Sequence, residues 1–151
     1  MTLELCPPKD IAACAKAMAE WLDNRTRLFV RAGPATVEIE LDWYRDKAKE
    51  EGQINWSIYA DGKFIGNCGM HDIDHTHRSA ELGILIADKK YWGKGIAAVA
   101  EVAMVEYAFD GLCAGGLNKI VAYVYVSRRG DGNEASRAAL RKVGFRDVGL
   151  L

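Results

Sequence analysis

The chain has no excess of basic residues and no long apolar run. Its 20 lysines and arginines face 21 aspartates and glutamates, which gives a formal net charge of −1. Proteins that bind the nucleic-acid backbone usually carry a basic surface, so we expect no nucleic-acid partner. No stretch reaches the roughly 20 apolar residues that cross a bilayer, and residues 1–10 lack the apolar core of a signal peptide. We therefore expect a cytoplasmic protein without a membrane partner.

Cysteine motifs are missing as well. The four cysteines, Cys6, Cys14, Cys68 and Cys113, form no C-x-x-C pair and stand among apolar or small residues. This pattern favours free thiols in a reducing compartment over disulfides or metal ligands. A cysteine nucleophile needs an activating base nearby, and the sequence identifies none.

The chain has the length and composition of one globular domain, with 151 residues of which 50% are hydrophobic and 27% charged. Turn signals and changes of hydrophobic period predict the order β-α-α-β-β-β-α-β-α-β. We expect strands at 3–6, 54–60, 63–74, 79–88, 119–127 and 145–151, and helices at 11–22, 37–51, 95–110 and 134–143. Residues 24–33 should form a loop, and Asp61-Gly62 a hairpin turn. The expected fold class is α/β, with a mixed (α+β) sheet and helices on both of its faces.

Residues 91–98 are the most informative segment. Gly93 and Gly95 form a turn between a strand-like run and the amphipathic helix that begins near Ile96. The first N–H groups of a helix have no partner inside it, and glycine lets an anion approach them closely. The helix dipole adds roughly 0.3–1 kcal/mol of favourable potential per negative charge. The turn therefore predicts a site for a phosphate-bearing molecule.

One alternative is a dinucleotide-binding domain, because Gly93-x-Gly95-x-x-Ala98 also fits G-x-G-x-x-A. That fingerprint expects glycine directly after the first strand of a parallel unit and an acidic residue at the end of the next strand. Here residues 88–92 intervene, antiparallel strands come before, and Ser127 ends the next strand. The sequence disfavours this alternative.

Three motifs together resemble the GNAT N-acetyltransferases. Lys90-x-x-Gly93-x-Gly95-x-Ala97 resembles the R/Q-x-x-G-x-G/A signature that cradles the pyrophosphate of acetyl-coenzyme A in that family. Residues 73–84 resemble the strand before the signature. Residues 133–145 resemble the second motif in the form of the RimJ/RimL-type branch, which is ribosomal-protein-alanine N-acetyltransferase-like. The resemblance covers residues 56–150 and, more weakly, the first fifty.

The resemblance implies the GNAT fold and acetyl-CoA as cosubstrate. In that fold a mostly antiparallel sheet is splayed between two parallel strands, here 82–87 and 120–126, and the pantetheine arm pairs with the backbone freed by the splay. Lys90 stands where arginine or glutamine is usual, and it still supplies a cation. The residues that would bind the cofactor are Ile84, Leu85, Ile86, Lys90, Trp92, Gly93, Lys94, Gly95, Ile96, Ala97 and Asn133.

The implied chemistry is direct attack of a primary amine on the thioester. A base must remove a proton from the amine, and an acid helps the thiolate to depart, while a backbone N–H near Leu85 would stabilise the oxyanion. Glu81 is the candidate base; alternatively it is a solvated carboxylate or a partner for Arg78. Ser136 is the candidate acid; alternatively it and Asn133 only cap a helix.

Candidates for acceptor binding come from two places. Trp43 and Tyr44 lie on the second helix, which often forms a lid in the family; the alternative is ordinary core packing. Residues 71–77 hold three histidines and two aspartates, a mixture that can bind zinc, but the turn scatters these side chains and we expect no metal. Asp72 and Asp74 could instead attract a cationic amine; the alternative is a solvated polar turn.

The chain also departs from the family pattern. Residues 113–116 and 128–132 look like extra residues, and Leu140 stands where many relatives have a tyrosine acid. Relatives continue with one more strand that helps to close the acceptor pocket. Two alternatives stay open for the single domain at 1–151: a truncated chain, or a partner chain that supplies this edge, as in a homodimer.

These observations predict an acyltransferase that moves acetyl from acetyl-CoA to a primary amine. The acceptor could be a protein N-terminus or a small molecule such as a polyamine, an amino sugar or an antibiotic. The alternative function is a non-catalytic CoA-binding or sensing module of the same fold.

Overall fold

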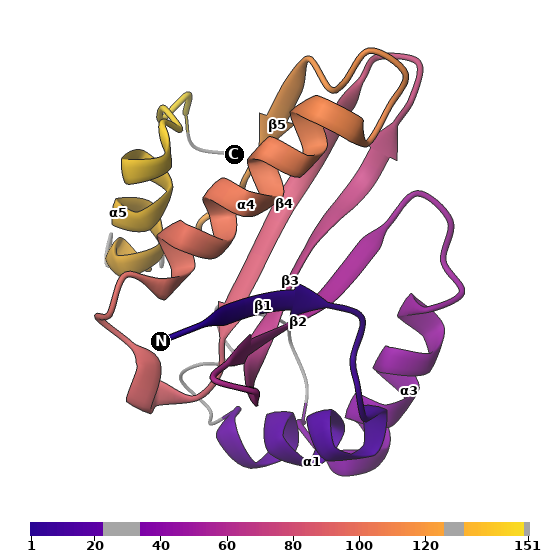
Figure 1. The fold of residues 1–151 in the computed structure, drawn as a ribbon, viewed down its shortest axis with the longest axis vertical. Helices are drawn as coiled ribbons and strands as arrows, with labels where there is room; N and C mark the ends of the chain where they lie inside the picture. The colour runs from indigo at the N-terminus through magenta and orange to yellow at the C-terminus, as the bar shows by residue number, and fades with distance from the viewer. Residues whose placement is uncertain (23–33, 126–131, 150–151) are drawn as a thin grey trace.

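The computed structural model describes residues 1–22, 34–125 and 132–149 (Figure 1). Within these ranges five strands form one sheet: β1 (Leu3–Cys6), β2 (Ile54–Ala60), β3 (Lys63–Asp74), β4 (Ser79–Ile86) and β5 (Lys119–Val121). The helices of the same ranges are α1 (Ile11–Trp21), α3 (Val37–Lys47), α4 (Ile96–Gly111) and α5 (Glu134–Val143), with a short 3-10 helix η1 (Lys89–Tyr91) before α4. The predicted order of elements is confirmed as far as residue 143.

The sheet is mixed, as predicted. Its strand order is β1-β2-β3-β4-β5, and the first four strands pair antiparallel. At the turn between β2 and β3, Asp61 has φ 48° and Gly62 has φ 78°, the left-handed conformation that a two-residue hairpin requires. β5 pairs parallel to β4, because the helix α4 carries the chain back between them.

The two parallel strands separate soon after they meet. β4 pairs with β5 only from Ser79 to Glu81, which face Lys119 to Val121. Beyond that point β4 continues to Ile86, while residues 122–125 belong to no strand. The predicted splay is therefore present, and the strand expected at 119–127 is wrong over 122–125. Its last two residues lie outside the described ranges.

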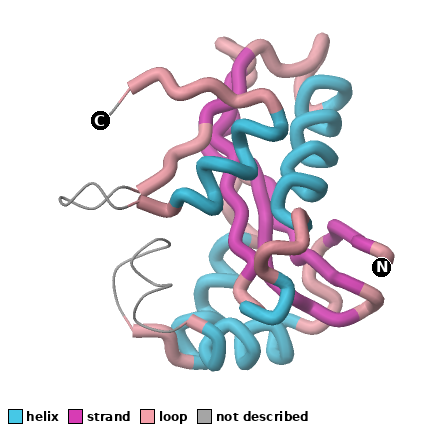
Figure 2. Tube along the Cα trace, turned by 90° about the vertical axis from the view of Figure 1, so that its left-hand side faces the viewer, coloured by secondary structure: helices cyan, strands magenta, loops and turns pink. Residues whose placement is uncertain are grey.

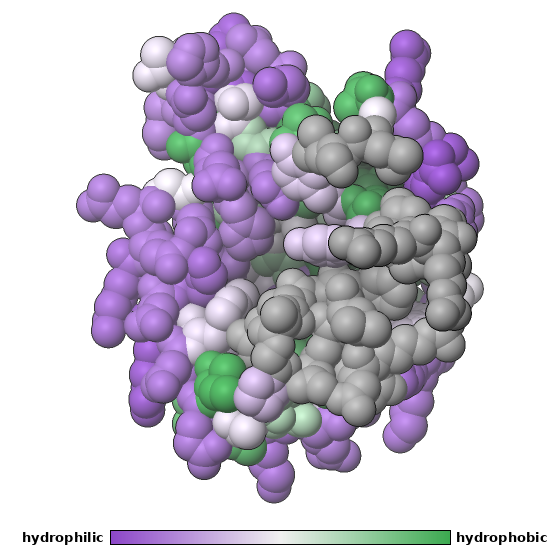
Figure 3. All heavy atoms as spheres, turned by 180° about the vertical axis from the view of Figure 1, so that it is seen from behind, coloured by the Kyte–Doolittle hydropathy of each residue, from purple (hydrophilic) through white to green (hydrophobic). Residues whose placement is uncertain are grey.

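Helices cover both faces of the sheet (Figure 2). One buried cluster joins α4 to the sheet, and it includes Ile58, Met70, Leu82, Ile96, Ala100 and Met104. A second cluster joins α1 and α3 to the end of β4, and it includes Cys14, Ala15, Met18, Tyr44 and Ala87. Seen from behind, hydrophilic side chains cover most of the coloured surface, and hydrophobic ones reach it in separate patches (Figure 3).

The helix boundaries follow from their caps. The Asp10 Oδ1 accepts the Ala13 N–H (2.9 Å) at the start of α1, and the Thr36 Oγ1 accepts the Ile39 N–H (3.3 Å) at the start of α3. The Asn133 Oδ1 accepts the Ser136 N–H at 3.2 Å and so begins α5. Gly144, at φ 108°, ends it. Aspartate, threonine and asparagine favour the N-cap and glycine the position after the last turn, so these caps explain where the predicted helices begin and where α5 ends.

Three boundaries differ from the prediction. β4 ends at Ile86 because Asp88 turns the chain, with its Oδ1 accepting the Lys90 N–H at 3.0 Å. α3 ends at Lys47, and the next residues form a tighter turn in which the Lys49 N–H bonds to the Asp46 carbonyl at 2.9 Å. The strand predicted from residue 145 is wrong over 145–149, which form no strand.

The segment after α5 is held by ion pairs instead. Asp147 accepts hydrogen bonds from Arg137 Nε (3.0 Å) and from the Arg141 guanidinium on α5, so the chain turns back along its own helix. The loop predicted at 24–33 lies outside the described residues. None of the described helices is long and apolar enough to span a bilayer.

Candidate active site

The glycine turn leaves the start of α4 open. Gly95 is the N-cap of α4 at φ 75°, and Gly93 has φ 71°, a conformation that favours glycine. No side chain caps this end of the helix, and a Cβ at either glycine would meet no described atom within 4 Å. The first N–H groups of this 16-residue helix therefore face free space, as binding of a phosphate group requires.

Polar contacts fix this turn against the end of β4. The buried Asp88 accepts the Lys90 N–H and pairs with Lys63 Nζ at 3.0 Å. The Trp92 indole N–H donates to the Ile86 carbonyl at 2.7 Å. Trp92 is 51% exposed, so its ring flanks the turn and is not part of the core.

A cavity of about 660 Å³ opens beside the turn, and we name it the cofactor cavity. Its lining includes nine of the predicted cofactor residues: Ile84, Leu85, Ile86, Trp92, Gly93, Gly95, Ile96, Ala97 and Asn133. Lys90 and Lys94 are not in the lining, and the Lys94 ammonium lies 5.1 Å from the centre of the Tyr91 ring. Two lysines that sequence reasoning missed, Lys89 and Lys142, do line it. Free helix N–H groups, open glycines and lysines match the chemistry of a diphosphate, so the residues present fit CoA.

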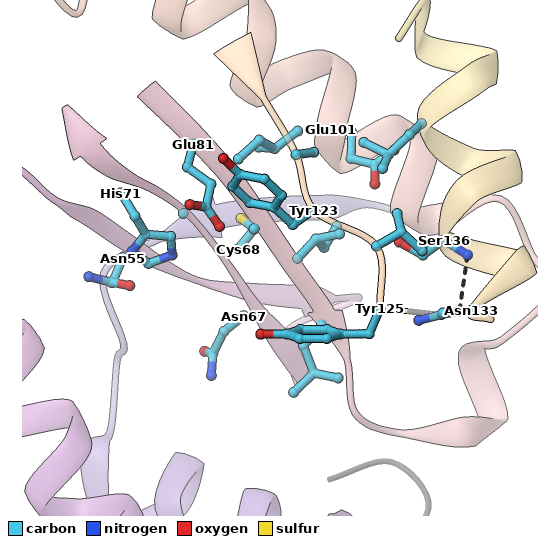
Figure 4. A pocket seen from close by; sticks show the side chains of 18 of the residues that line it. Asn55, Asn67, Cys68, His71, Glu81, Glu101, Tyr123, Tyr125, Asn133 and Ser136 are labelled. Carbon is cyan, nitrogen blue, oxygen red and sulfur yellow. Dashed lines mark hydrogen bonds between the residues drawn. The ribbon is translucent and has the colours of Figure 1, made fainter. Parts of the chain in front are cut away.

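A second cavity of about 530 Å³ lies on the other side of the splay, and we name it the acceptor cavity (Figure 4). Its walls come mainly from β3, β4, the segment 122–125, α3 and α5, and α1, β2 and α4 contribute Met18, Asn55 and Glu101. Five residues line both cavities: Ile84, Leu85, Glu101, Asn133 and Ser136. The two cavities therefore meet where β4 diverges from residues 122–125, and we name this place the junction.

Glu81 lines the acceptor cavity from β4. Burial, with a smaller contribution from Asp72, raises the pKa of its carboxyl. Arg78 is engaged elsewhere, since its guanidinium donates to the Gly115 carbonyl (3.1 Å) and to Asn118 Oδ1 (2.6 Å). Those bonds weaken the alternative in which Glu81 only neutralises Arg78.

His71 lines the same cavity from β3, directly opposite Glu81 in the ladder. Its Nδ1 lies 3.0 Å from Gln53 Oε1, which also accepts a hydrogen bond from Lys47 Nζ at 3.2 Å. A carbonyl oxygen can only accept, so Nδ1 carries the proton and Nε2 is the free acceptor. Burial, aided by Lys47, lowers the pKa of His71. Sequence reasoning treated His71 only as a metal ligand, although its place on the strand beside the acceptor side was available as a signal.

Ser136 and Asn133 belong to the junction. Asn133 caps α5 by accepting the Ser136 N–H, and both side chains also line both cavities (Figure 4). The alternative in which they act as a helix cap is therefore confirmed for Asn133, and it leaves the Ser136 hydroxyl exposed to the cavity. Leu140, at the position of the family's tyrosine, is buried in the acceptor-cavity wall.

Glu101 is the junction residue that sequence reasoning missed. It lies in the second turn of α4 and is fully buried. Neither carboxylate oxygen has a hydrogen-bond partner in the described chain, and burial raises its pKa to about 7. The sequence signal that could have identified Glu101 is its position between the apolar residues Ala100 and Met104 of α4.

Family membership follows from a match that spans almost the whole chain. The Acetyltransferase (GNAT) domain family matches residues 2–146. The chain belongs to the GNAT acetyltransferase family. The putative ribosomal N-acetyltransferase YdaF of Bacillus subtilis is 32% identical over 158 residues, which cover 99% of this chain and 79% of that protein. Spermidine N(1)-acetyltransferase of Escherichia coli K12 is 28% identical over 137 residues, which cover 91% of this chain and 64% of that protein.

Solved structures agree with the fold of this GNAT protein. The spermidine N-acetyltransferase from Vibrio cholerae in complex with CoA and spermine has a TM-score of 0.77 at 21% identity, covering 97% of this chain and 82% of that one. A probable acetyltransferase has a TM-score of 0.72 at 29% identity, covering 97% and 79%. The predicted fold, family and cosubstrate are confirmed: the protein is an acetyl-CoA-dependent N-acetyltransferase. The dinucleotide-binding alternative is wrong, because the sheet before the turn is antiparallel.

Of the four predicted acceptor residues of this GNAT enzyme, one lines the acceptor cavity and three do not. Trp43 lines the acceptor cavity, whereas Tyr44 is buried beneath it with its hydroxyl bonded to Asn67 at 3.0 Å. Asp72 and Asp74 are not among the lining residues. Asp74 accepts the N–H groups of two turn residues at 2.8 Å each, and these bonds hold its pKa near 2.

The histidines of the GNAT enzyme point to separate partners. His71 bonds to Gln53, His77 bonds to Asp74 at 2.7 Å, and His75 Nδ1 lies 3.2 Å from Cys113 Sγ. Among the described residues, no three histidine, cysteine or acidic side chains are arranged to hold a metal ion.

Proposed function

We propose that this GNAT enzyme acetylates a small cationic primary amine of the polyamine class. The observation that carries the proposal is the Glu81 carboxyl, which lines the acceptor cavity from β4 and which Arg78 does not neutralise. Among the described residues that line the cavity, the basic groups are Lys47, which is already bound to Glu50 (2.7 Å), and His71, whose pKa is lowered. A cavity with this balance favours a cation over an anion.

The relatives support the same class. A protein 28% identical to this chain is named for spermidine, and a structure with the same fold holds CoA and spermine. A protein N-terminus is the second candidate, favoured by the 32% identity to a putative ribosomal N-acetyltransferase. Both acceptors present a primary amine that must lose a proton before it attacks.

In the proposed reaction, different residues bind the cofactor, orient it and accept the amine proton. The N-terminus of α4 and the glycine turn bind the diphosphate of acetyl-CoA. The unpaired edge of β4 from Leu82 to Ile86 orients the pantetheine arm, and an N–H near Leu85 stabilises the oxyanion. Glu81 accepts the amine proton, directly or through a water, while Trp43 packs against the acceptor. Positioning of the amine supplies much of the remaining acceleration.

The test is an acceptor panel with release of the CoA thiol as readout. Spermidine and spermine are compared with an alanine-terminated peptide, glucosamine and a blank without acceptor. We expect turnover with the polyamines at least about tenfold above the peptide, a difference of about 1.4 kcal/mol in transition-state binding. Preference for the peptide would reject the polyamine class and support the second candidate. No turnover with any amine would reject both.

We further propose that residues 1–151 form a single GNAT domain, that the enzyme works in the cytoplasm without a nucleic-acid or membrane partner, and that it forms a homodimer. Free thiols at all four cysteines support a reducing compartment. On α4, Val99 (57% exposed), Val102 (41%) and Phe109 (42%) present apolar side chains to the surface, which supports self-association. Light scattering after gel filtration tests the dimer, and a monomer at assay concentration would reject it.

A further inference from the structure

Glu101 is a buried acid at the junction of the two cavities, and it has no hydrogen-bond partner among the residues that the structure describes. Its side chain is 0% exposed, and neither carboxylate oxygen accepts a hydrogen bond from the described chain. Figure 4 shows it projecting from α4 on the side of the cavity where Ser136 lies. A carboxyl group kept unpaired in such a place costs folding free energy, which indicates a ligand or a reaction that uses it.

The other junction residues indicate which reaction step could use the Glu101 carboxyl. Ile84 and Leu85 offer only backbone groups and apolar side chains, and the Asn133 carbonyl oxygen is occupied by the α5 cap. Glu101 and Ser136 are therefore the junction side chains that carry acidic protons. The acetyl–sulfur bond of a donor bound across both cavities has to cross this junction, because the junction is where they meet.

We propose that Glu101 supplies the proton that the CoA sulfur takes up when the acetyl–sulfur bond breaks, with the Ser136 hydroxyl as the relay. The inference rests on the proposed function of the site. The amine nitrogen forms a bond to the acetyl carbon, and the carbon–sulfur bond breaks with its electron pair on sulfur. Ser136 gives its hydroxyl proton to the sulfur and takes one from Glu101, which becomes a carboxylate. The two side chains share no hydrogen bond in the described chain, so the relay requires that binding of the donor brings them into contact. The amine proton goes to Glu81, and exchange with solvent later removes that proton from Glu81 and returns one to Glu101.

The relative acid strengths of a serine hydroxyl, a thiol and a carboxylic acid favour Glu101 as the source of the proton that the sulfur takes up. A serine hydroxyl is a weaker acid than a thiol, so Ser136 alone cannot protonate a thiolate completely. A carboxylic acid is stronger than a thiol, whose ordinary pKa is about 8.5. Burial raises the pKa of Glu101 to about 7, so at neutral pH a large share of the enzyme holds the proton ready.

Other ionisable groups surround the same space. On the acceptor side they are Glu40 and Lys47 of α3, Cys68 and His71 of β3, Glu81 of β4, and the phenols of Tyr123 and Tyr125. On the cofactor side they are Lys89, Tyr91, Glu134 and Lys142. The raised pKa of Glu101 comes from burial alone. No single charged neighbour therefore determines whether its carboxyl is protonated.

The kinetic test compares two acetyl donors. Glu101→Gln keeps the shape of the side chain but removes the acid, and Glu106→Gln, on the exposed face of α4, is the matched control. With acetyl-CoA we expect Glu101→Gln to lower kcat by about 10²–10³-fold, the typical contribution of a general acid. With acetyl-seleno-CoA, whose selenol leaves without a proton, the loss should shrink to less than about tenfold. Equal losses with both donors, or a wild-type kcat with acetyl-CoA, would overturn the proposal.

A second test needs neither turnover nor an acceptor. The thiol of bound CoA is titrated by its thiolate absorbance, and calorimetry checks that CoA binds the wild type and Glu101→Gln within about threefold, a difference below 1 kcal/mol. An ionised Glu101 beside the sulfur should raise the pKa of the bound thiol in the wild type above that in Glu101→Gln. Identical thiol titrations would show that Glu101 does not reach the sulfur. If Glu101→Gln fails to fold, infrared spectroscopy of the wild type tests the proposal. A carboxyl band that titrates near pH 7 and shifts when CoA binds supports it. A band that does not respond to CoA overturns it.

Failure of this inference is distinct from failure of the proposed function. A panel without turnover would remove the proposed acceptor, while the thiol titration would still report on Glu101. An active enzyme with an unaffected thiol would remove Glu101 and leave the proposed function intact.

Discussion

His71 on β3 and Glu81 on β4 stand directly opposite each other in the antiparallel ladder, and both line the acceptor cavity (Figure 4). Burial moves their pKa values toward each other, upward for Glu81 and downward for His71. The lowered pKa of His71 favours a neutral imidazole at neutral pH, and the raised pKa of Glu81 makes its carboxylate a stronger base than an exposed glutamate. Two proton acceptors thus share the side of the cavity where an amine must lose its proton.

Glu81→Gln should remove the base and leave the cofactor cavity unchanged. We expect kcat/KM at neutral pH to fall by about 10²–10³-fold, as is typical for loss of a general base, with CoA affinity near the wild-type value. Steady-state kinetics and calorimetry measure the two quantities. Glu38→Gln, an exposed carboxylate on α3, is the control. Wild-type turnover of Glu81→Gln at every pH would remove Glu81 from the mechanism.

Asp72→Asn should move the acid limb of the pH–rate profile to lower pH. The negative charge of Asp72 raises the pKa of Glu81 and opposes the lowering of the pKa of His71. Removing that charge lowers both pKa values, so the bases stay deprotonated to a lower pH. The profile of kcat/KM, which reports groups of the free enzyme, measures the shift. A limb that stays in place or moves upward would contradict the assignment of the base to this pair.

Gly95→Ala and Gly62→Ala form a matched pair. Both glycines have positive φ, 75° and 78°, and a Cβ at either would meet no described atom within 4 Å. Each substitution should therefore cost a similar backbone strain, about 1 kcal/mol of unfolding free energy. Only Gly95→Ala should also weaken CoA binding, by at least about tenfold, because its methyl group occupies the approach to the α4 N-terminus. Equal CoA affinity of the two variants in calorimetry would contradict the anion site.

Glu101→Leu should change how stability depends on pH. Burial raises the pKa of Glu101 from 4.5 to about 7 in the folded protein, so the folded state binds this proton more tightly than the unfolded state does. Stability from this group is therefore full below pH 4.5 and is lost as the pH rises through about 7. The wild type should lose about 3 kcal/mol relative to Glu101→Leu across that window. Urea unfolding at several pH values measures the difference, and parallel curves for the two proteins would contradict it.

Much of the fold was predictable because its signals are local. The caps at Asp10, Thr36 and Asn133 and the hairpin at Asp61-Gly62 each depend on a few adjacent residues. The cofactor turn was predictable for the same reason, because its two glycines are followed directly by the helix. Sequence reasoning did not predict the short helix η1, in which Lys89 lines the cavity and Lys90 does not. Lys94, beyond η1, is also outside the lining.

The acceptor side depends on contacts between distant segments, which single-chain patterns do not reveal. The pairing of His71 with Glu81 depends on the register of two strands with an irregularity between them. The burial of Glu101 depends on α4 being covered on a face where its own sequence shows almost no hydrophobic asymmetry. The end of β5 at Val121 depends on the divergence of two backbones, since residues 122–125 have the composition of a strand but belong to no strand in the described chain.

Because β4 and residues 122–125 diverge, part of one edge of β4 is unpaired in the described chain. From Leu82 to Ile86 the outer edge of β4 has no strand beside it in the described chain, so its amides are left to whatever extended molecule occupies the gap. A coenzyme arm that carries its own amides would complete the fold as well as serve the reaction. An extended segment of another protein would pair with the same edge by the same backbone hydrogen bonds, so a bound coenzyme arm and such a segment would exclude each other.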